Sequence, residues 1–348
     1  MRSLALDGLR ALPVLVIIAD HSWLDALELP FGHLGVRFFF VLSGFFITAM
    51  LIRARDKVDF RRQSALFSFY VRRVLRTFPP YFLMLGVVLY FNVADVRDTW
   101  LWHVTFTTNF LFAWVNNWEP WILGHMWSLC IQEQFYLLWP LLIFVVPKTH
   151  YGTLCWGFIA LSLLYRIVVI AMGPYVLWVH VLPPASWDAL AVGSLLAIAR
   201  SRDAQGPRMN WMVSLGLLGA SLWLAVLDIP NMHVFWSVWS LGELAGLYPL
   251  VHLINTVASG RDFYILKWAP MVFLGRISFG LYLYHVMAIA ALYRYLPSQS
   301  EPTALRFLCV TAVTVTIAIL SWYCMERPIM RVRDTLMRPR PAAAGSSA

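Results

Sequence analysis

The chain has 348 residues, of which 60% are apolar and only 13% are charged, and its formal net charge is +9. This composition excludes an ordinary soluble domain and is typical of a protein that crosses a membrane several times. The four cysteines lie in apolar segments without CxxC spacing, which indicates neither a disulfide framework nor a zinc site. We therefore expect no metal.

Apolar stretches of roughly the 20 residues that cross a bilayer recur along the whole chain. They fall at 8–27, 34–52, 78–94, 121–146, 152–172, 185–200, 210–228, 234–256, 269–292 and 303–325. These stretches predict an all-α membrane protein, a polytopic bundle of about ten transmembrane helices within residues 1–335. Residues 336–348 are small or polar and are expected to form a short disordered cytoplasmic tail.

The distribution of lysine and arginine predicts the orientation, because cytoplasmic loops retain these residues. They gather between the second and third stretches and after the sixth, eighth and tenth, whereas the alternate loops are nearly free of them. Both termini are therefore predicted in the cytoplasm, and the tryptophan-rich segment 95–121 is predicted outside. The asymmetry accounts for most of the net charge, so no nucleic-acid partner is expected.

The first stretch contains an arginine and a histidine, in the segment LDGLRALPVLVIIADHS. On one continuous helix, Arg10 and His21 would share a face at a distance of about 16 Å. We interpret Arg10 as a group that holds an anion entering from the cytoplasm and His21 as a titratable group that acts on its far end. Two plainer readings are that Arg10 snorkels to the membrane surface and that His21 only joins two helices.

Three arginines, Arg72, Arg73 and Arg76, stand just before Pro79 and Pro80, where we expect a break ahead of the third span. Guanidinium groups bind phosphate bidentately, so the cluster suits a phosphorylated ligand. It would equally suit lipid headgroups.

Further polar residues fall within the later spans. Glu133 lies about 18 Å into its helix by helical rise, Asp188 lies near an outer helix end, and His285 lies at mid-span, two turns after Ser278. A polar group at such a depth is costly unless it is paired or functional, and a buried pair that fixes helix packing would also explain each of them.

Taken in chain order, these segments resemble the acyltransferase 3 family of integral membrane acyltransferases, which acylate sugars and other hydroxyl acceptors. The resemblance runs along almost the whole chain. It rests on Arg10 and His21 with ten residues between them, GVRFFFVLSGF (35–45), RRVLRTFPPY (72–81), WSLCIQEQFYL (127–137), DALAVGSLLA (188–197), GRISFGLYLYH (275–285) and ERP (326–328).

The resemblance implies transfer of an acyl group, most often acetyl, from an acyl-CoA to a hydroxyl of a carbohydrate or other cell-envelope acceptor, in a bacterial inner membrane. The implied catalytic residues are His21, as general base or acyl relay, Glu133, which would orient the imidazole, and Asp188. The implied acyl-CoA-binding residues are Arg10, Arg72, Arg73 and Arg76. Candidate acceptor or oxyanion contacts are Arg37, Ser43, Ser128, Ser278 and His285.

Three positions depart from the family pattern. Members often have an acidic residue where this chain has Arg37, a glutamate where it has Gln132, and an arginine where it has Ser186. We expect Arg37 to pair with Asp20 or Glu133, or to contact an anionic acceptor.

Two other functions remain open. One is an acyl-group translocator that feeds a separate transferase, because its motifs would be the same. The other is a proton-coupled transporter in which intramembrane ionisable residues form a relay. The expected partners are the lipid bilayer, acyl-CoA and a hydroxyl acceptor, and a homo-oligomer is left open.

Overall fold

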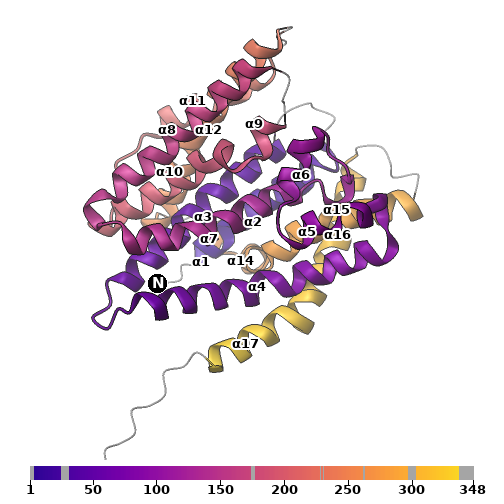
Figure 1. Cartoon of the computed structure of the whole chain (residues 1–348), viewed down its shortest axis with the longest axis horizontal. Helices are drawn as coiled ribbons and strands as arrows, with labels where there is room; N and C mark the ends of the chain where they lie inside the picture. Colours follow the sequence, from indigo (N-terminus) through magenta and orange to yellow (C-terminus); the bar gives the residue numbers. More distant parts are fainter. Residues whose placement is uncertain are drawn as a thin grey trace, which may run out of the picture.

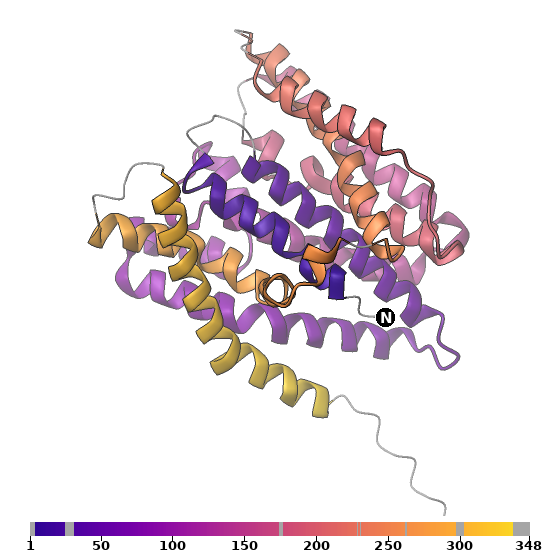
Figure 2. The same cartoon turned by 180° about the vertical axis from the view of Figure 1, so that it is seen from behind.

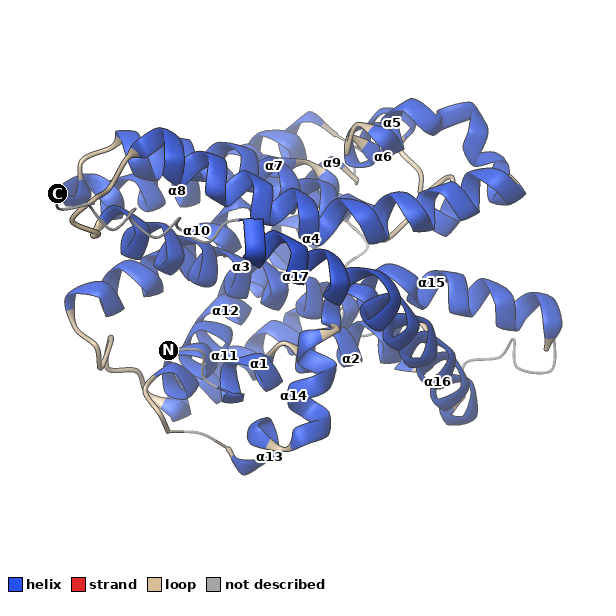
Figure 3. Cartoon of the chain, turned by 90° about the horizontal axis from the view of Figure 1, so that it is seen from below, coloured by secondary structure: helices blue, strands red, loops and turns tan. Residues whose placement is uncertain are grey.

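The computed structural model describes residues 4–24, 31–173, 177–227, 229, 231–261, 263–296 and 303–336, and within these ranges it contains helices and no strand (Figures 1 and 3). The all-α class is thus confirmed. The predicted tail lies outside the described residues from 337 onward. The helices are α1 (Leu4–Leu9), α2 (Ala11–Asp20), α3 (Phe31–Arg55), α4 (Arg62–Phe91), α5 (Trp100–Val104), α6 (Thr108–Val115), α7 (Met126–Val145), α8 (Tyr151–Met172), α9 (Trp178–Val181), α10 (Pro183–Arg202), α11 (Trp211–Ala225), α12 (Met232–Ala258), α13 (Tyr264–Lys267), α14 (Ala269–Arg276), α15 (Ser278–Tyr295), α16 (Ala304–Ser321) and α17 (Arg327–Leu336).

Among the described residues, six helices are long and apolar enough to cross a membrane. They are Phe31–Arg55, Arg62–Phe91, Met126–Val145, Lys148–Met172, Trp178–Arg202 and Ala304–Thr335. The pair α14 and α15, bent by 76°, would be a seventh span if it crosses as one unit. A multi-pass architecture is therefore supported, whereas the predicted count of about ten spans and the orientation of the termini stay predictions.

The first apolar stretch is not the continuous helix that the sequence suggested. Helix α1 ends at Leu9 and α2 begins at Ala11, so Arg10 stands at the junction. His21 follows the last residue of α2 and caps it, with its backbone N–H 3.1 Å from the carbonyl oxygen of Ile17. The end of this stretch, from residue 25 onward, lies outside the described residues.

Helix α4 also differs from the prediction, because it begins at Arg62 and runs through Pro79 and Pro80 without ending. The basic segment expected as a loop therefore forms the first half of a long helix on one side of the bundle (Figures 1 and 2). Apolar residues at helical spacing, Leu66, Phe69 and Tyr70, pack this half against the core. Prolines are tolerated inside such helices because neighbouring groups satisfy the freed backbone carbonyls.

A close helix crossing joins α3 to α10 through two glycines. A methyl group on Gly44 would lie 1.9 Å from the carbonyl oxygen of Leu190, and one on Gly193 would lie 2.0 Å from that of Val41. Beside the crossing, Thr48 Oγ1 lies 2.8 Å from Ser194 Oγ. Small residues at a helix interface allow this approach, which fixes α10 against α3 at the centre of the bundle.

Candidate active site

A cavity of about 1130 Å³ lies between the first half of α4 and the helices α1, α3, α7 and α15. Its acidic lining residues are Asp7 and Asp59. Its basic lining residues are Arg10, Arg53, Lys57, Arg61, Arg72, Arg73, Arg76, Arg200 and Arg333. The cavity is thus large and strongly positive, which suits an extended anionic ligand.

The arginines of α4 have different surroundings. Arg73 donates to Oε1 of Glu133 from Nε at 3.1 Å and from Nη2 at 2.9 Å, and its guanidinium lies 3.7 Å from the ring centre of Tyr136. Arg72 is exposed and lies one turn from Arg76 on the same helix. We infer that Arg73 is held by the protein itself, so Arg72 and Arg76 are the α4 groups best placed for a ligand.

Arg10 lines the same cavity from the α1–α2 junction. Its guanidinium lies 4.1 Å from the ring centre of Phe46, and its Nη1 lies 3.5 Å from Oδ1 of Asp7. The structure therefore brings together the four arginines that the sequence grouped, although the helix is interrupted where it was predicted to be continuous.

The inner part of the cavity is lined by smaller polar groups. Ser43, Ser128 and Ser278 line it, together with Gln132 and Tyr282. Gln132 Nε2 donates to Ser43 Oγ at 3.3 Å, and the hydroxyls of Ser128 and Tyr282 are 2.5 Å apart. The three predicted serines are thus at one site, and Tyr282 is a polar residue there that the sequence analysis missed.

Behind Tyr282 lies a pair of histidines. Nδ1 of His21 is 2.9 Å from Nε2 of His285, and the two rings stack with centroids 5.1 Å apart. Nδ1 of His285 is 2.6 Å from the carbonyl oxygen of Tyr282, one turn earlier on α15. A carbonyl oxygen only accepts hydrogen bonds, so Nδ1 of His285 carries the hydrogen.

The position of the hydrogen on His285 determines the position of the hydrogen on His21. Neutral His285 then accepts at Nε2, so Nδ1 of His21 must be the donor and Nε2 of neutral His21 carries a lone pair. His21 is 38% exposed, and its Nε2 lies 4.0 Å from Oδ2 of Asp20. The arrangement places a basic imidazole nitrogen near a carboxylate, which suits general-base chemistry.

A third histidine, His125, completes the group and was not identified from the sequence. Its ring meets the edge of His285 with centroids 4.9 Å apart, and its Nε2 lies 3.2 Å from the carbonyl oxygen of Leu283. Tyr282 donates to the carbonyl oxygen of His125 at 2.6 Å. Both residues could have been found from the sequence: His125 immediately precedes the MWSL segment, and Tyr282 lies one helical turn before His285.

The predicted partnership between Glu133 and His21 is not supported by this geometry. Oε1 of Glu133 binds Arg73, and His285 occupies the place at Nδ1 of His21 that a carboxylate was expected to take. Glu133 compensates a cation on the cavity wall, and that pairing explains a carboxylate at this depth.

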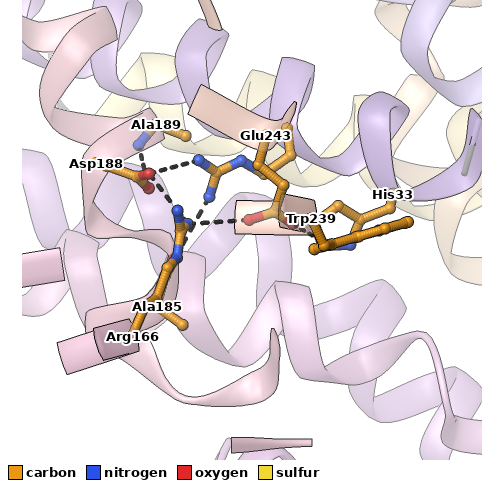
Figure 4. Close-up of polar contacts among 8 residues, drawn as sticks. His33, Arg166, Ala185, Asp188, Ala189, Trp239 and Glu243 are labelled. Atoms are coloured by element: carbon orange, nitrogen blue, oxygen red, sulfur yellow. Dashed lines mark hydrogen bonds and ion pairs between the residues drawn. The ribbon is translucent and has the colours of Figure 1, made fainter. Parts of the chain in front are cut away.

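Asp188 belongs to a different, buried group (Figure 4). Its Oδ2 lies 2.7 Å from Nη2 of Arg37 and 3.0 Å from Nη2 of Arg166, whose Nη2 is 3.2 Å from Oε2 of Glu243.

The pairing of Arg37 with Asp20 or Glu133 was therefore wrong. Two of the departures are connected, because the cation absent at Ser186 is supplied to Asp188 by Arg37. The surroundings of Asp188 are those of a structural ion pair, which does not support the catalytic role we predicted for it.

Comparison with known proteins identifies the family of the chain. Residues 3–323 match the family model described as an acyltransferase domain, and the chain belongs to that family. It is therefore a multi-pass membrane acyltransferase, and the resemblance seen in its motifs is confirmed.

Among the relatives is a putative O-acetyltransferase of Staphylococcus aureus (strain COL), 27% identical over 97% of this chain and 59% of the relative. The peptidoglycan O-acetyltransferase OatA of Listeria monocytogenes is 28% identical over 94% of this chain and 56% of its own length. The O-acetyltransferase OatA of Staphylococcus aureus (strain NCTC 8325 / PS 47) is 27% identical over 94% and 57%. The chain thus spans a little over half of these relatives. No solved structure matches it.

Proposed function

We propose that the chain moves an acetyl group from acetyl-CoA to a hydroxyl of a cell-envelope carbohydrate, with His21 as the general base. One observation carries the proposal. Tyr282 lines the arginine-lined cavity and donates a hydrogen bond to the backbone of His125, whose ring contacts His285, the partner of His21.

The cavity suits the two chemically different ends of an acyl-CoA. Arg72 and Arg76 would bind the phosphates, because guanidinium groups form bidentate, charge-assisted bonds with them. Arg61, the residue before α4, and Thr77 within α4 both line the cavity and lie about 24 Å apart by helical rise. The inner lining includes the apolar side chains of Val36, Phe39 and Leu42, which suit the uncharged arm and the thioester.

The histidine pair then supplies the acid–base chemistry. As the acceptor oxygen attacks the thioester carbonyl carbon, Nε2 of His21 takes the hydroxyl proton. The C–O bond forms, the C–S bond breaks, and the proton passes to the departing thiolate, which leaves as CoA. The hydroxyl of Ser128 is the candidate donor to the oxyanion, since the single hydroxyl hydrogen of Tyr282 is donated to the carbonyl oxygen of His125. Acyl transfer through His21 itself would use the same lone pair.

The acceptor proposal draws on the relatives and on the predicted topology. One relative is named as a peptidoglycan O-acetyltransferase. With about ten spans and both termini in the cytoplasm of a bacterial inner membrane, the arginine end of the cavity faces the cytoplasmic donor. The acceptor then approaches the histidine end from outside.

The experiment uses inverted membrane vesicles from a strain of the source organism that lacks the native gene. The strain produces the wild type, His21→Ala or Arg62→Gln protein instead. Labelled acetyl-CoA is added, and label is followed into glycans, glycolipids and the protein. We expect transfer to a glycan or glycolipid by wild type and by Arg62→Gln, whose residue is exposed and does not line the cavity, and none by His21→Ala.

Equal transfer by His21→Ala would refute the base assignment. If label accumulates on the protein alone, the chain acts as an acyl-group translocator and not as the transferase. If label does not move but protons are taken up without acetyl-CoA, the transporter is the correct function.

A further inference from the structure

A second group of side chains lies apart from the cavity and has no part in the proposed reaction. His33 near the start of α3, His180 in α9 and Glu243 in α12 converge in the bundle. Figure 4 shows His33 and Glu243 of this group. One ligand atom from each residue lies within 4.8 Å of the others. Three separate helices thus place two imidazoles and one carboxylate around a single point.

These residue types form the ligand set of many zinc sites. Zn–N and Zn–O bonds of about 2.0 to 2.2 Å in a tetrahedral arrangement require ligand atoms about 3.4 Å apart. Nε2 of His33 and Oε1 of Glu243 are in direct contact as an ion pair, so these two atoms must separate to admit an ion at that spacing. An Nε2 atom and a carboxylate oxygen that face the same point are typical of two ligands that share one cation.

The second layer of contacts supports the ligands. Oε1 of Glu243 accepts a hydrogen bond from Trp239 Nε1 at 3.1 Å, and Oε2 is 3.2 Å from Arg166 Nη2. The ring of His33 stacks on Trp127 with centroids 6.2 Å apart. Such outer contacts fix the orientation of metal ligands.

The charges around the group determine what else the ion would bind. Arg37 and Arg166 balance Asp188 and Glu243, so a divalent ion adds positive charge to a mostly buried place. Three protein ligands leave one coordination position open. Water there would deprotonate readily and would offset part of the charge.

We propose that His33, His180 and Glu243 bind a divalent transition-metal ion, with Zn²⁺ as the best match to the donor set, and that the ion joins α9 and α12 to α3. The site adjoins the segment that carries the catalytic histidine. A methyl group added to Gly32, next to His33, would lie 2.3 Å from Oδ2 of Asp20, the residue before His21. The inference does not depend on acyl transfer.

The test measures metal in the purified, detergent-solubilised full chain after incubation with ZnCl₂ and removal of free metal. We expect about one Zn²⁺ per wild-type chain. We expect the bound zinc per chain to fall about tenfold or more in His33→Ala and in Glu243→Gln. His150→Ala, which removes an exposed histidine away from the group, should keep its metal.

A ligand-preserving variant separates metal loss from misfolding. His33→Cys should retain zinc because a thiolate replaces the imidazole, whereas His33→Ala should not. Wild type with fewer than about 0.1 equivalents of zinc, and no thermal stabilisation by added ZnCl₂, would overturn the proposal. Zinc binding that is equal in wild type, His33→Ala and Glu243→Gln would also overturn it.

Discussion

At the scale of single residues, a backbone carbonyl determines which nitrogen of His21 carries the hydrogen, through two successive hydrogen bonds. Tyr282 O fixes the hydrogen on His285, and His285 in turn fixes the hydrogen on His21. His285 thus takes the orienting place that a carboxylate has in hydrolase triads. A neutral imidazole stabilises an imidazolium less than a carboxylate does, so the carboxylate of Asp20, 4.0 Å from His21 Nε2, becomes the nearby negative charge for the protonated state.

The first prediction tests His285 as a positioning residue. His285→Leu removes both hydrogen bonds and should lower kcat by roughly 100-fold, because His21 loses its preferred tautomer. His285→Gln keeps a donor and an acceptor and should recover much of that loss. Rates of labelled-acetyl transfer and their pH profiles measure the effect. If the two variants lose activity equally, with unchanged pH profiles, His285 has only a packing role.

The second prediction concerns Asp188, which is fully buried between two guanidiniums. Asp188→Asn leaves Arg37 and Arg166 undercompensated and should lower the free energy of unfolding by about 3–5 kcal/mol. Thermal unfolding of the purified protein in detergent measures this. A variant as stable as wild type but unable to transfer acetyl would contradict the structural role and restore the catalytic one.

The sequence predicted several residues of the site but not how they pair. His21, His285 and Ser128 were identified because a polar group in an apolar span is conspicuous. The α4 arginines were identified because a cluster of guanidinium groups suits phosphate. The partner of Arg37 lies 151 residues away along the chain, and only the α3–α10 crossing makes them neighbours. Glu133 was assigned to the wrong partner for the same reason.

At the scale of helices, the two glycines explain how α10 approaches α3 closely enough to bury Asp188. The oxygens that an added methyl group would meet belong to backbone carbonyls within helices, so they cannot move aside as a flexible side chain would.

The third prediction follows from that contact. Gly44→Ala and Gly193→Ala should each destabilise the protein by about 1–3 kcal/mol, as overpacking does in tight interfaces. Gly157→Ala in α8 is the matched control, since no atom lies within 4 Å of the added methyl group. Thermal unfolding should therefore show a lower transition temperature for the first two variants only. An unchanged transition temperature in Gly44→Ala would show that the two helices can separate without cost.

Helix bounds were predicted less well than the existence of helices. Within the described residues, each apolar stretch lies mainly on helices, because a helix that crosses lipid is apolar around most of its circumference. The start of α4 was missed because its first half is amphipathic and basic, a pattern that hydropathy alone assigns to a loop. The break at Arg10 was missed because a single turn interrupts the helix without any proline or glycine at that position.

At the scale of the whole molecule, the orientation rests on the asymmetry of lysine and arginine. The basic cavity lining and the α3–α4 connection both belong to the side predicted to face the cytoplasm. The segment from η2 (Val93–Thr99) to α6 lies at the other end of α4 (Figures 1 and 2).

The fourth prediction tests that orientation by cysteine labelling in a Cys324→Ser background, since Cys324 is the exposed cysteine. Val58→Cys, in the connection between α3 and α4, should react with a membrane-impermeant maleimide in inverted vesicles only. Trp114→Cys, at the end of α6, should react in intact cells only. Protein atoms do not cover either side chain, and both belong to segments predicted to lie outside the bilayer. Labelling of both positions from one side would refute the topology.

The last prediction tests the division of the site into a phosphate-binding end and a reacting end. Initial rates of labelled-acetyl transfer are measured in inverted vesicles against acetyl-CoA concentration for wild type, Arg72→Gln, Arg62→Gln and His21→Ala. Arg72→Gln should raise the KM for acetyl-CoA about tenfold with little change in kcat. His21→Ala should lower kcat by at least about 100-fold. Arg62→Gln should match wild type in both parameters. An unchanged KM in Arg72→Gln together with an unchanged kcat in His21→Ala would contradict the account.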